Sequence, residues 1–255
     1  MKFRVVIPAR HGATRLPGKP LRILVGRPMI WHVYQRAVES GADQVVIATD
    51  HRSVMEAGSA FGAEVCMTSR SHRSGSDRIA EVAEKYGWAD TDIVVNLQGD
   101  EPTMPSENVA RVAENLAGTE GADITTLCTP VGTVEELLDP NVVKVVRDAR
   151  AFALYFSRAP VPWNRDGGFS VDAGMPPGIW YRHIGLYAYR VPALRRYTQL
   201  DPCELENKES LEQLRALWHG MRIHVGDALA LPGIGVDTEA DLERVEQLLR
   251  EEQEA

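Results

Sequence analysis

Residues 5–20 of the chain read V-V-I-P-A-R-H-G-A-T-R-L-P-G-K-P. The β-branched run Val5–Ile7 predicts a short buried strand. Pro8 ends that strand, because proline lacks the N–H group that a continuing ladder requires. Glycine and proline residues then recur through the following ten residues or so, which predicts a tight and stiffened loop. The chain therefore opens with a strand that delivers a structured loop.

This loop carries three cations, Arg10, Arg15 and Lys19. Guanidinium groups offer planar pairs of donors and an ammonium offers a point charge, so the set suits a polyphosphate. Backbone N–H groups near Gly12 and Gly18 can add further donors. A solvated basic loop is the competing interpretation. The P-loop and dinucleotide patterns are both absent, because no Ser or Thr follows Lys19 and the glycines are wrongly spaced.

Composition places the chain among soluble globular proteins. Its 255 residues suffice for one large domain or two small ones, with 44% hydrophobic and 25% charged residues. The formal charge of −8 argues against a nucleic-acid partner, although a local cationic cluster can still bind a small anion. We expect no membrane span and no signal peptide. Three widely spaced cysteines, Cys66, Cys128 and Cys203, predict idle thiols in a reduced, cytoplasmic protein.

Strands and helices alternate through the first half of the sequence. This rhythm predicts parallel strands joined by right-handed crossovers. We expect Asp50 to cap the helix that follows it, and Ser76 or Asp77 to cap the next one. The predicted helices are 28–40, 50–61, 79–86 and 105–117, and the predicted strands are 5–7, 45–47, 63–67, 93–95 and 124–128.

The second half predicts a change to a mixed sheet. Apolar runs 142–146 and 151–156 flank a polar turn, as in an antiparallel hairpin. Residues 157–180 are rich in Pro and Gly, and an irregular stretch of this length is usually functional or mobile. Residues 209–220 predict one helix whose core stripe includes Leu211, Leu214, Leu217 and Trp218. The other predicted elements are helices 134–138, 192–200 and one beginning near 238, and strands 181–190 and 223–225.

Polar residues follow several of the predicted strands, where open α/β sheets bind ligands. Asp100 lies in the polar run Asn96–Glu101, and a carboxylate there can hold a hard cation such as Mg²⁺ or cap a turn. The segment 71–78 precedes a helix N-terminus, which favours an anion or a base edge. On the strand 181–190, His183, Tyr187 and Tyr189 share one face by the period of two, as sugar contacts or as a buried aromatic face.

Several motifs resemble the CMP-Kdo synthetases (3-deoxy-manno-octulosonate cytidylyltransferases), a family of sugar-activating nucleotidyltransferases. They occur in the family's order over most of the chain, from Val5 to about Arg244. The departure is His11-Gly12-Ala13, which stands where relatives commonly carry an aromatic and small residues. The motifs are A-R-H-G-A-T-R-L-P-G-K-P (9–20), H-R-S-G-S-D-R (72–78), V-N-L-Q-G-D-E-P (95–102), S-R-A-P-V-P-W-N-R-D (157–166), R-H-I-G-L-Y-A-Y-R (182–190), S-L-E-Q-L-R (210–215) and G-V-D-T (235–238).

The resemblance implies a fold and a reaction. The fold is a Rossmann-like α/β nucleotidyltransferase domain with a mixed, mostly parallel central sheet and an antiparallel extension. It would span 1–255, with a nucleotide-binding half (about 1–130), a sugar-binding and dimer-forming part (about 131–230), and a metal-ligand loop with the C-terminal helix (231–255). The reaction joins CTP and Kdo into CMP-Kdo and diphosphate for lipopolysaccharide biosynthesis, with Mg²⁺ as cofactor and a homodimer as the assembly.

The resemblance also assigns residues. Asp100 and Asp237 are implied as metal ligands, although Asp237 also suits a helix cap. Arg10, Arg15 and Lys19 would act with these two acids as catalytic groups. The nucleotide would contact the same three cations and Arg73, Ser74 and Gln98. The sugar acid would contact Arg165, His183, Tyr187, Glu212 and Gln213.

Three hypotheses stay open on the sequence. The first is Kdo activation, and the second is activation of another acid sugar, such as an 8-amino analogue of Kdo or a sialic acid. The third is a non-catalytic nucleotide-binding relative, which the joint presence of Lys19, Asp100 and Asp237 argues against. His11 could serve as a general base, but the sequence shows no carboxylate partner for it.

Overall fold

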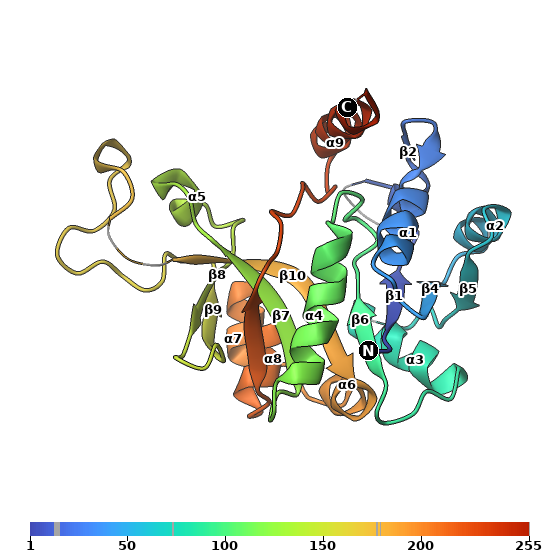
Figure 1. The fold of residues 1–255 in the computed structure, drawn as a ribbon, viewed down its shortest axis with the longest axis horizontal. Helices are drawn as coiled ribbons and strands as arrows, with labels where there is room; N and C mark the ends of the chain where they lie inside the picture. The colour runs from blue at the N-terminus through green and yellow to red at the C-terminus, as the bar shows by residue number, and fades with distance from the viewer. Residues whose placement is uncertain (13–15, 73, 177, 179, 255) are drawn as a thin grey trace.

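A mixed sheet of nine strands forms the centre of the molecule, with helices on both faces (Figure 1). The computed structural model describes residues 1–12, 16–72, 74–176, 178 and 180–254. The main path of the sheet runs in the order β11-β7-β10-β6-β1-β4-β5, and β8 joins β10 and carries β9. Its strands are β1 (Arg4–Pro8), β4 (Gln44–Thr49), β5 (Glu64–Met67), β6 (Ile93–Asn96), β7 (Ile124–Pro130), β8 (Lys144–Arg147), β9 (Ala153–Ser157), β10 (Tyr181–Arg190) and β11 (Ile223–Asp227).

The first half of the chain has the predicted parallel arrangement. Strand β1 lies between β4 and β6, and Val5 is in register with both Val45 and Val95. Strand β5 extends this parallel group beyond β4. The intervening helices are α1 (Met29–Glu39), α2 (Arg52–Ala60), α3 (Gly75–Lys85) and α4 (Ser106–Gly118). Because β1 is central, the loop that leaves it emerges at the middle of the sheet edge.

The second half supplies the antiparallel extension. Strand β10 runs antiparallel to β6, β7 and β8, and the β8–β9 hairpin is antiparallel as predicted. Strands β7 and β11 pair in parallel. The sheet is therefore mixed and mostly parallel, as expected. The helices of this half are α5 (Val134–Leu138), α6 (Val191–Thr198), α7 (Glu204–Glu209), α8 (Gln213–Trp218) and α9 (Glu239–Glu254).

Each face of the sheet has its own hydrophobic core. On one face, Ile30, Val33 and Val109 of α1 and α4 pack on alternate strand residues such as Val5 and Val95. On the other face, α3, α6 and α8 cover residues such as Val6 and Val94. The alternation along β1 and β6 thus buries both faces.

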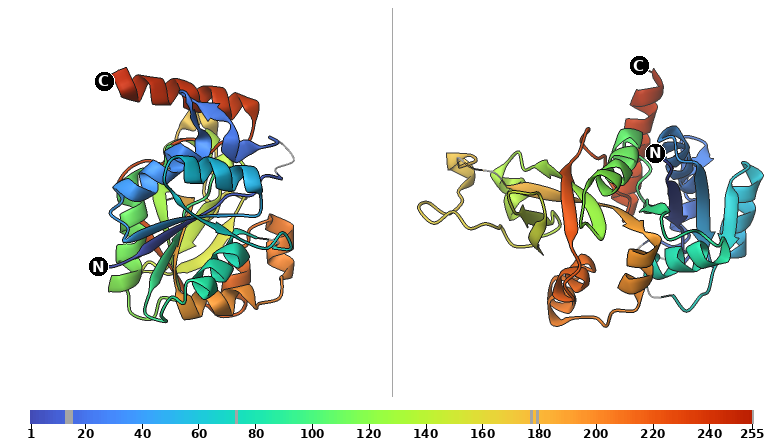
Figure 2. Two further views of the ribbon diagram at one scale, coloured as in Figure 1. Left: turned by 90° about the vertical axis from the view of Figure 1, so that its right-hand side faces the viewer. Right: turned by 60° about the horizontal axis from the view of Figure 1, so that its bottom comes forward.

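A third cluster joins the ends of the chain. The hairpin of β2 (Ile23–Leu24) and β3 (Arg27–Pro28), which the sequence did not predict, contacts α9. Leu16, Leu24 and Met29 pack there with Val236 and Val245. The left view of Figure 2 shows α9 lying above this hairpin, and the right view shows the segment 158–176 projecting at the left, away from α2 and β5. In its described residues (158–176, 178 and 180), the segment 158–180 contains one short 3₁₀ turn, Val171–Ala173, and is otherwise irregular as expected.

Two helix caps differ from the prediction. His51, not Asp50, caps α2, and its ring nitrogen accepts the N–H of Ser53. The Asp50 carboxylate instead accepts from Arg78 of α3 at 2.9 Å, because the buried guanidinium needs a charged partner. Ser74 caps α3 and forms a reciprocal box with Asp77, so the helix begins earlier than predicted.

The expected single helix over 209–220 is also wrong. It is broken at Ser210, whose φ of 52° lies in the left-handed region. A continuous helix needs the Glu209 carbonyl for its own ladder, but this carbonyl accepts from Nε of Arg158 at 2.6 Å. Leu211 and Leu214 are buried as predicted, whereas Trp218 is 57% exposed and does not belong to the core.

Cys66, Cys128 and Cys203 are buried and form no disulfide, as the sequence analysis expected. Among the described residues, no helix combines the length and apolar character that crossing a bilayer requires.

Candidate active site

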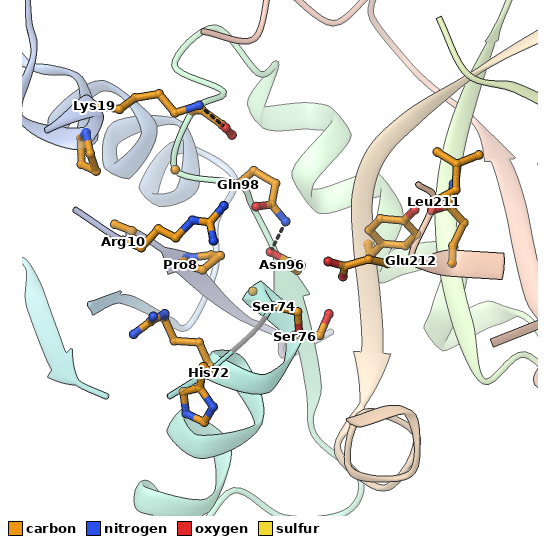
Figure 3. A pocket seen from close by; sticks show the side chains of 18 of the residues that line it. Pro8, Arg10, Lys19, His72, Ser74, Ser76, Asn96, Gln98, Leu211 and Glu212 are labelled. Atoms are coloured by element: carbon orange, nitrogen blue, oxygen red, sulfur yellow. Dashed lines mark hydrogen bonds and ion pairs between the residues drawn. The ribbon is translucent and has the colours of Figure 1, made fainter. Parts of the chain in front are cut away.

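A cavity of about 470 Å³ lies at the carboxyl ends of β1 and β6. Figure 3 shows the side chains that line it, with Arg10 and Lys19 on one side and Glu212 entering from the other. Both halves of the chain contribute to its walls. Of the predicted site residues, it is lined by Arg10, Lys19, Ser74, Gln98, Asp100, Tyr187, Glu212, Gln213 and Asp237.

The loop after β1 places Lys19 at the cavity. Gly18 adopts a φ of 66°, a left-handed conformation that glycine accepts without strain, and a 3₁₀ turn, Lys19–Leu21, begins directly after it. Arg10 lies at the start of the same loop and also lines the cavity. Arg15 falls outside the described residues.

The Lys19 ammonium connects two carboxylates that are distant in sequence. Its Nζ lies 2.7 Å from Oδ2 of Asp100 and 3.0 Å from Oδ1 of Asp237, and it donates to the Val236 carbonyl at 2.7 Å. Burial alone would lower the pKa of Lys19, but the two aspartates outweigh burial and raise it. The ammonium therefore stays charged between the two acids.

The residues that follow Asp237 explain why its carboxylate is available to contact Lys19. Thr238 and Asp241 form the cap of α9: Asp241 accepts the N–H groups of Asp237 and Thr238, and its own N–H donates to the Thr238 hydroxyl. The cap is thus supplied by neighbours of Asp237. Its carboxylate contacts Lys19, which favours the binding interpretation over the capping one.

The surroundings of the ammonium fit a divalent cation. Three oxygen atoms, from Asp100, Asp237 and Val236, surround the Lys19 ammonium. The ammonium therefore occupies the position that a metal ion would take. Oxygen ligands of this kind suit Mg²⁺, which typically takes one or two carboxylates and completes its shell with phosphate oxygens and water. Within the described ranges, no three His, Cys, Asp or Glu residues gather as a self-sufficient metal site.

The N-terminus of α3 forms the floor of the cavity. Gly75 packs against Pro8, and a Cβ at position 75 would lie 3.3 Å from the Pro8 ring. Ser74 and Ser76 line the cavity beside it. N-terminal N–H groups and these hydroxyls offer donors to an anion or a base edge. Arg73, also predicted here, lies outside the described residues.

Glu81 secures the loop that leads into α3. Its carboxylate accepts from the Ser69 N–H at 2.8 Å, contacts Nε2 of His72 at 2.5 Å, and pairs with Lys85 at 2.8 Å. Burial alone would raise the pKa of Glu81, but these donors outweigh it and hold the pKa at about 2. His72, which lines the cavity, is positioned through this carboxylate.

The loop after β6 closes against β1. A Cβ at Gly99 would lie 2.8 Å from the Pro8 carbonyl oxygen, so glycine permits this approach. Gln98 donates from Nε2 to Asn96 at 3.1 Å, and both line the cavity (Figure 3). This packing aims Gln98 and Asp100 at the same space.

The second half supplies the far wall. Tyr187 lies opposite Asn96 in the β10–β6 register, and Glu212 and Gln213 stand at the start of α8. Burial raises the pKa of Glu212 and raises that of Tyr187 well above its ordinary value. Tyr187 therefore keeps its phenolic proton and can donate it in a hydrogen bond.

Two predicted sugar contacts lie elsewhere. His183 is next to Tyr187, with ring centroids 5.5 Å apart, but it lines an adjoining cavity of about 320 Å³. Burial lowers the pKa of His183 to about 3, so the ring is neutral, and its Nε2 lies 3.0 Å from the Thr126 hydroxyl. Arg165 is exposed on the projecting segment and lines neither cavity.

Some cavity residues were not among those assigned to the site from the family resemblance. Two of them had a local signal, because Asn96 ends β6 and Tyr189 shares the face of Tyr187. The tertiary folding that brings in Tyr197 and Ser210 had no local signal. The additional residues include His72, Ser76, Arg78, Asn96, Tyr189, Tyr197, Ser210 and Leu211.

We predict that Glu81→Gln destabilises the protein in a pH-dependent way. Because folding lowers the pKa of Glu81 from 4.5 to about 2, its contribution is fully present above pH 4.5 and fades as the pH falls toward 2. Urea unfolding at a series of pH values should show the gap to wild type closing in that window. Glu84→Gln, at an exposed position of the same helix, is the control. A gap that is independent of pH would contradict this account.

Comparison with known proteins assigns the family. A model described as cytidylyltransferase matches residues 4–223. The chain is 57% identical to the 3-deoxy-manno-octulosonate cytidylyltransferase of Thioalkalivibrio sulfidiphilus, covering 98% of this chain and 100% of the relative. It is 58% identical to the protein of the same name from Halorhodospira halophila, covering 97% of each.

Solved structures agree with this result. A CMP:2-keto-3-deoxy-manno-octonic acid synthetase in complex with CTP is similar with a TM-score of 0.89 and 42% identity, covering 99% of this chain and 100% of that one. A cytidylyltransferase from Leptospira borgpetersenii, at 16% identity and a TM-score of 0.61, covers 98% of this chain and 87% of its own and shares the fold. The cavity, the convergent acids and these matches together place the chain in the 3-deoxy-manno-octulosonate cytidylyltransferase family.

Proposed function

We infer that this chain is a cytidylyltransferase that activates the sugar acid Kdo, converting CTP and Kdo into CMP-Kdo and diphosphate for lipopolysaccharide biosynthesis. The observation that carries this conclusion is the convergence of Lys19, Asp100 and Asp237 at a cavity whose far wall holds Tyr187 and Glu212. Cations and metal-type ligands on one side, with hydroxyl and carboxyl groups on the other, match a triphosphate and a sugar.

The proposed reaction is a single displacement at phosphorus. The anomeric hydroxyl of Kdo attacks the α-phosphorus of CTP, and the bond from that phosphorus to the β-phosphate oxygen breaks to release diphosphate. No covalent enzyme intermediate is needed, so the protein contributes positioning and stabilisation of phosphate charge. Arg10, Arg15 and Lys19 would neutralise the triphosphate and the departing diphosphate.

We propose Mg²⁺ as the cofactor, held by Asp100 and Asp237. When bound, it supplies positive charge at phosphate oxygens and lowers the pKa of a nearby hydroxyl. The Lys19 ammonium now occupies the space between both carboxylates. We therefore expect Lys19 to turn toward the triphosphate when nucleotide binds, which would release the two acids without leaving any charge unpaired.

The remaining predicted residues divide between the two substrates. Ser74 and Gln98, with Arg73, would contact the base and ribose from the α3 and β6 side of the cavity. Glu212 and Gln213 would contact sugar hydroxyls, and the protonated Tyr187 would donate to one. His183 would contact the sugar only if the sugar extends into the adjoining cavity, which Tyr187, Leu211 and Gln213 also line.

We also propose a cytoplasmic homodimer. The projecting segment 158–180 exposes Trp163 by 66% and Val171 by 53%, and a second copy could cover these side chains. Arg165 lies on the same segment, so its expected contact with the sugar carboxylate would depend on how this segment packs in the assembly.

Substrate identity is tested by diphosphate release with CTP, ATP, GTP and UTP, each with and without Kdo. We predict release only when CTP and Kdo are both present, because the proposed displacement needs the sugar hydroxyl as nucleophile. An 8-amino analogue and a sialic acid are the comparison sugars. Faster turnover with one of them would reassign the sugar, and no release from any pair would contradict the proposed function.

We predict that Asp100→Ala and Asp237→Ala each abolish diphosphate release while the fold is kept. Each variant removes one of the two carboxylates that would hold the cofactor. Circular dichroism checks the fold, and Asp90→Ala is the control because Asp90 is an exposed aspartate that pairs with Arg195. Near-normal turnover in either site variant would refute the two-carboxylate metal site.

A further inference from the structure

The segment 228–236, here called the return segment, connects β11 to Asp237. It crosses from the second half of the sheet to the loop after β6. Pro232, Gly233 and Gly235 of this segment also line the adjoining cavity of about 320 Å³. The path of the return segment therefore sets both the position of Asp237 and one wall of that cavity.

Burial of large side chains does not explain how the first part of this segment is held, whereas Val236 at its far end is fully buried in the third hydrophobic cluster. Leu229 is 61% exposed and Leu231 is 77% exposed, so the apolar side chains at its start gain little from packing. The first part of the segment lacks such anchoring and needs hydrogen bonds to keep a defined path.

Asn108 supplies those hydrogen bonds. It is fully buried in the first turn of α4. Its Oδ1 accepts the N–H of Leu229 at 2.9 Å and that of Ala230 at 3.2 Å, and its Nδ2 donates to the Ala230 carbonyl at 2.8 Å. One side chain thus satisfies three backbone groups of a segment more than a hundred residues away in sequence.

The far end of the return segment lies directly on the loop after β6. A Cβ at Gly233 would be 2.0 Å from the Thr103 hydroxyl oxygen, and one at Gly235 would be 2.8 Å from a Glu101 carboxylate oxygen. The N–H of Val236 donates to the Asp100 carbonyl at 2.8 Å. Asn108 therefore fixes where the segment starts, and the Asp100 backbone together with the buried Val236 side chain fixes where it ends.

We propose that Asn108 is a positioning residue for the metal site, acting through the return segment to place Asp237 beside Asp100. This inference rests on the proposed function, since it assigns Asp237 to the cation. Loss of the three hydrogen bonds would let the segment move and would weaken the two-carboxylate site, whereas the core around α4 would persist.

The test compares Asn108→Ala and Asn108→Asp with wild type. Asn115→Ala is the matched control, because Asn115 is a buried asparagine on the same helix that packs against Gly226 of β11 rather than against the return segment. Amide hydrogen exchange follows Leu229 and Ala230, and electron paramagnetic resonance follows Mn²⁺ binding to the protein in the presence of CTP and without Kdo. Diphosphate release against Mg²⁺ concentration gives the third measurement.

We expect Asn108→Ala to speed exchange of both amides and to weaken Mn²⁺ binding by about tenfold or more, the effect typical of lost partners around metal ligands. Half-maximal turnover should need correspondingly more Mg²⁺, and excess Mg²⁺ should restore the rate. Asn108→Asp keeps the acceptor oxygen, so its amide exchange and Mn²⁺ affinity should lie between those of wild type and Asn108→Ala. If the alanine variant does not fold, the aspartate variant is used for the test. Asn115→Ala should match wild type in all three.

Asn108 variants that match Asn115→Ala in amide exchange and in Mn²⁺ affinity would overturn the inference. If wild type neither binds Mn²⁺ nor releases diphosphate, the proposed function fails instead. Even then, the claim that Asn108 fixes the start of the return segment can be tested by amide exchange in Asn108→Ala. Unchanged exchange at Leu229 and Ala230 would overturn this claim, and faster exchange would support it.

Discussion

The contact of the Lys19 ammonium with Asp100 and Asp237 is the interaction on which the site depends. It joins the loop after β1, the loop after β6 and the segment that leads into α9. The Lys19 side chain is 13% exposed, so its charge requires both partners to offset the cost of burial. Three segments that are remote in sequence are thereby held at one point, with oxygen ligands already facing a positive charge.

The rest of the fold serves this point by bringing two chemically different walls together. The parallel group β5-β4-β1-β6 delivers Lys19, Ser74 and Gln98 from the carboxyl ends of β1, β5 and β6, as open α/β sheets do. The antiparallel strand β10 inserts beside β6 and places Tyr187 opposite Asn96. A cationic wall for phosphate and a hydroxyl-bearing wall for a sugar then face each other across one cavity.

Much of this arrangement was predictable from local sequence. The strand before Pro8, the polar end of β6 and the β8–β9 hairpin each have a short-range pattern, and the motifs then located Lys19, Asp100 and Asp237. Competition between local and distant partners was not predictable. Asp50 suits a cap but pairs with Arg78, and the helix over 209–220 breaks because Arg158 takes a carbonyl that the helix needs. Asn108 has no motif, and its role depends on a segment that only tertiary folding brings near.

The most direct measurement is a crystal structure of the protein with CTP and Mg²⁺. The account predicts a cation bound to both Asp100 and Asp237, with the Lys19 ammonium moved onto the phosphates. A cation held elsewhere, with Lys19 still between the two carboxylates, would contradict it.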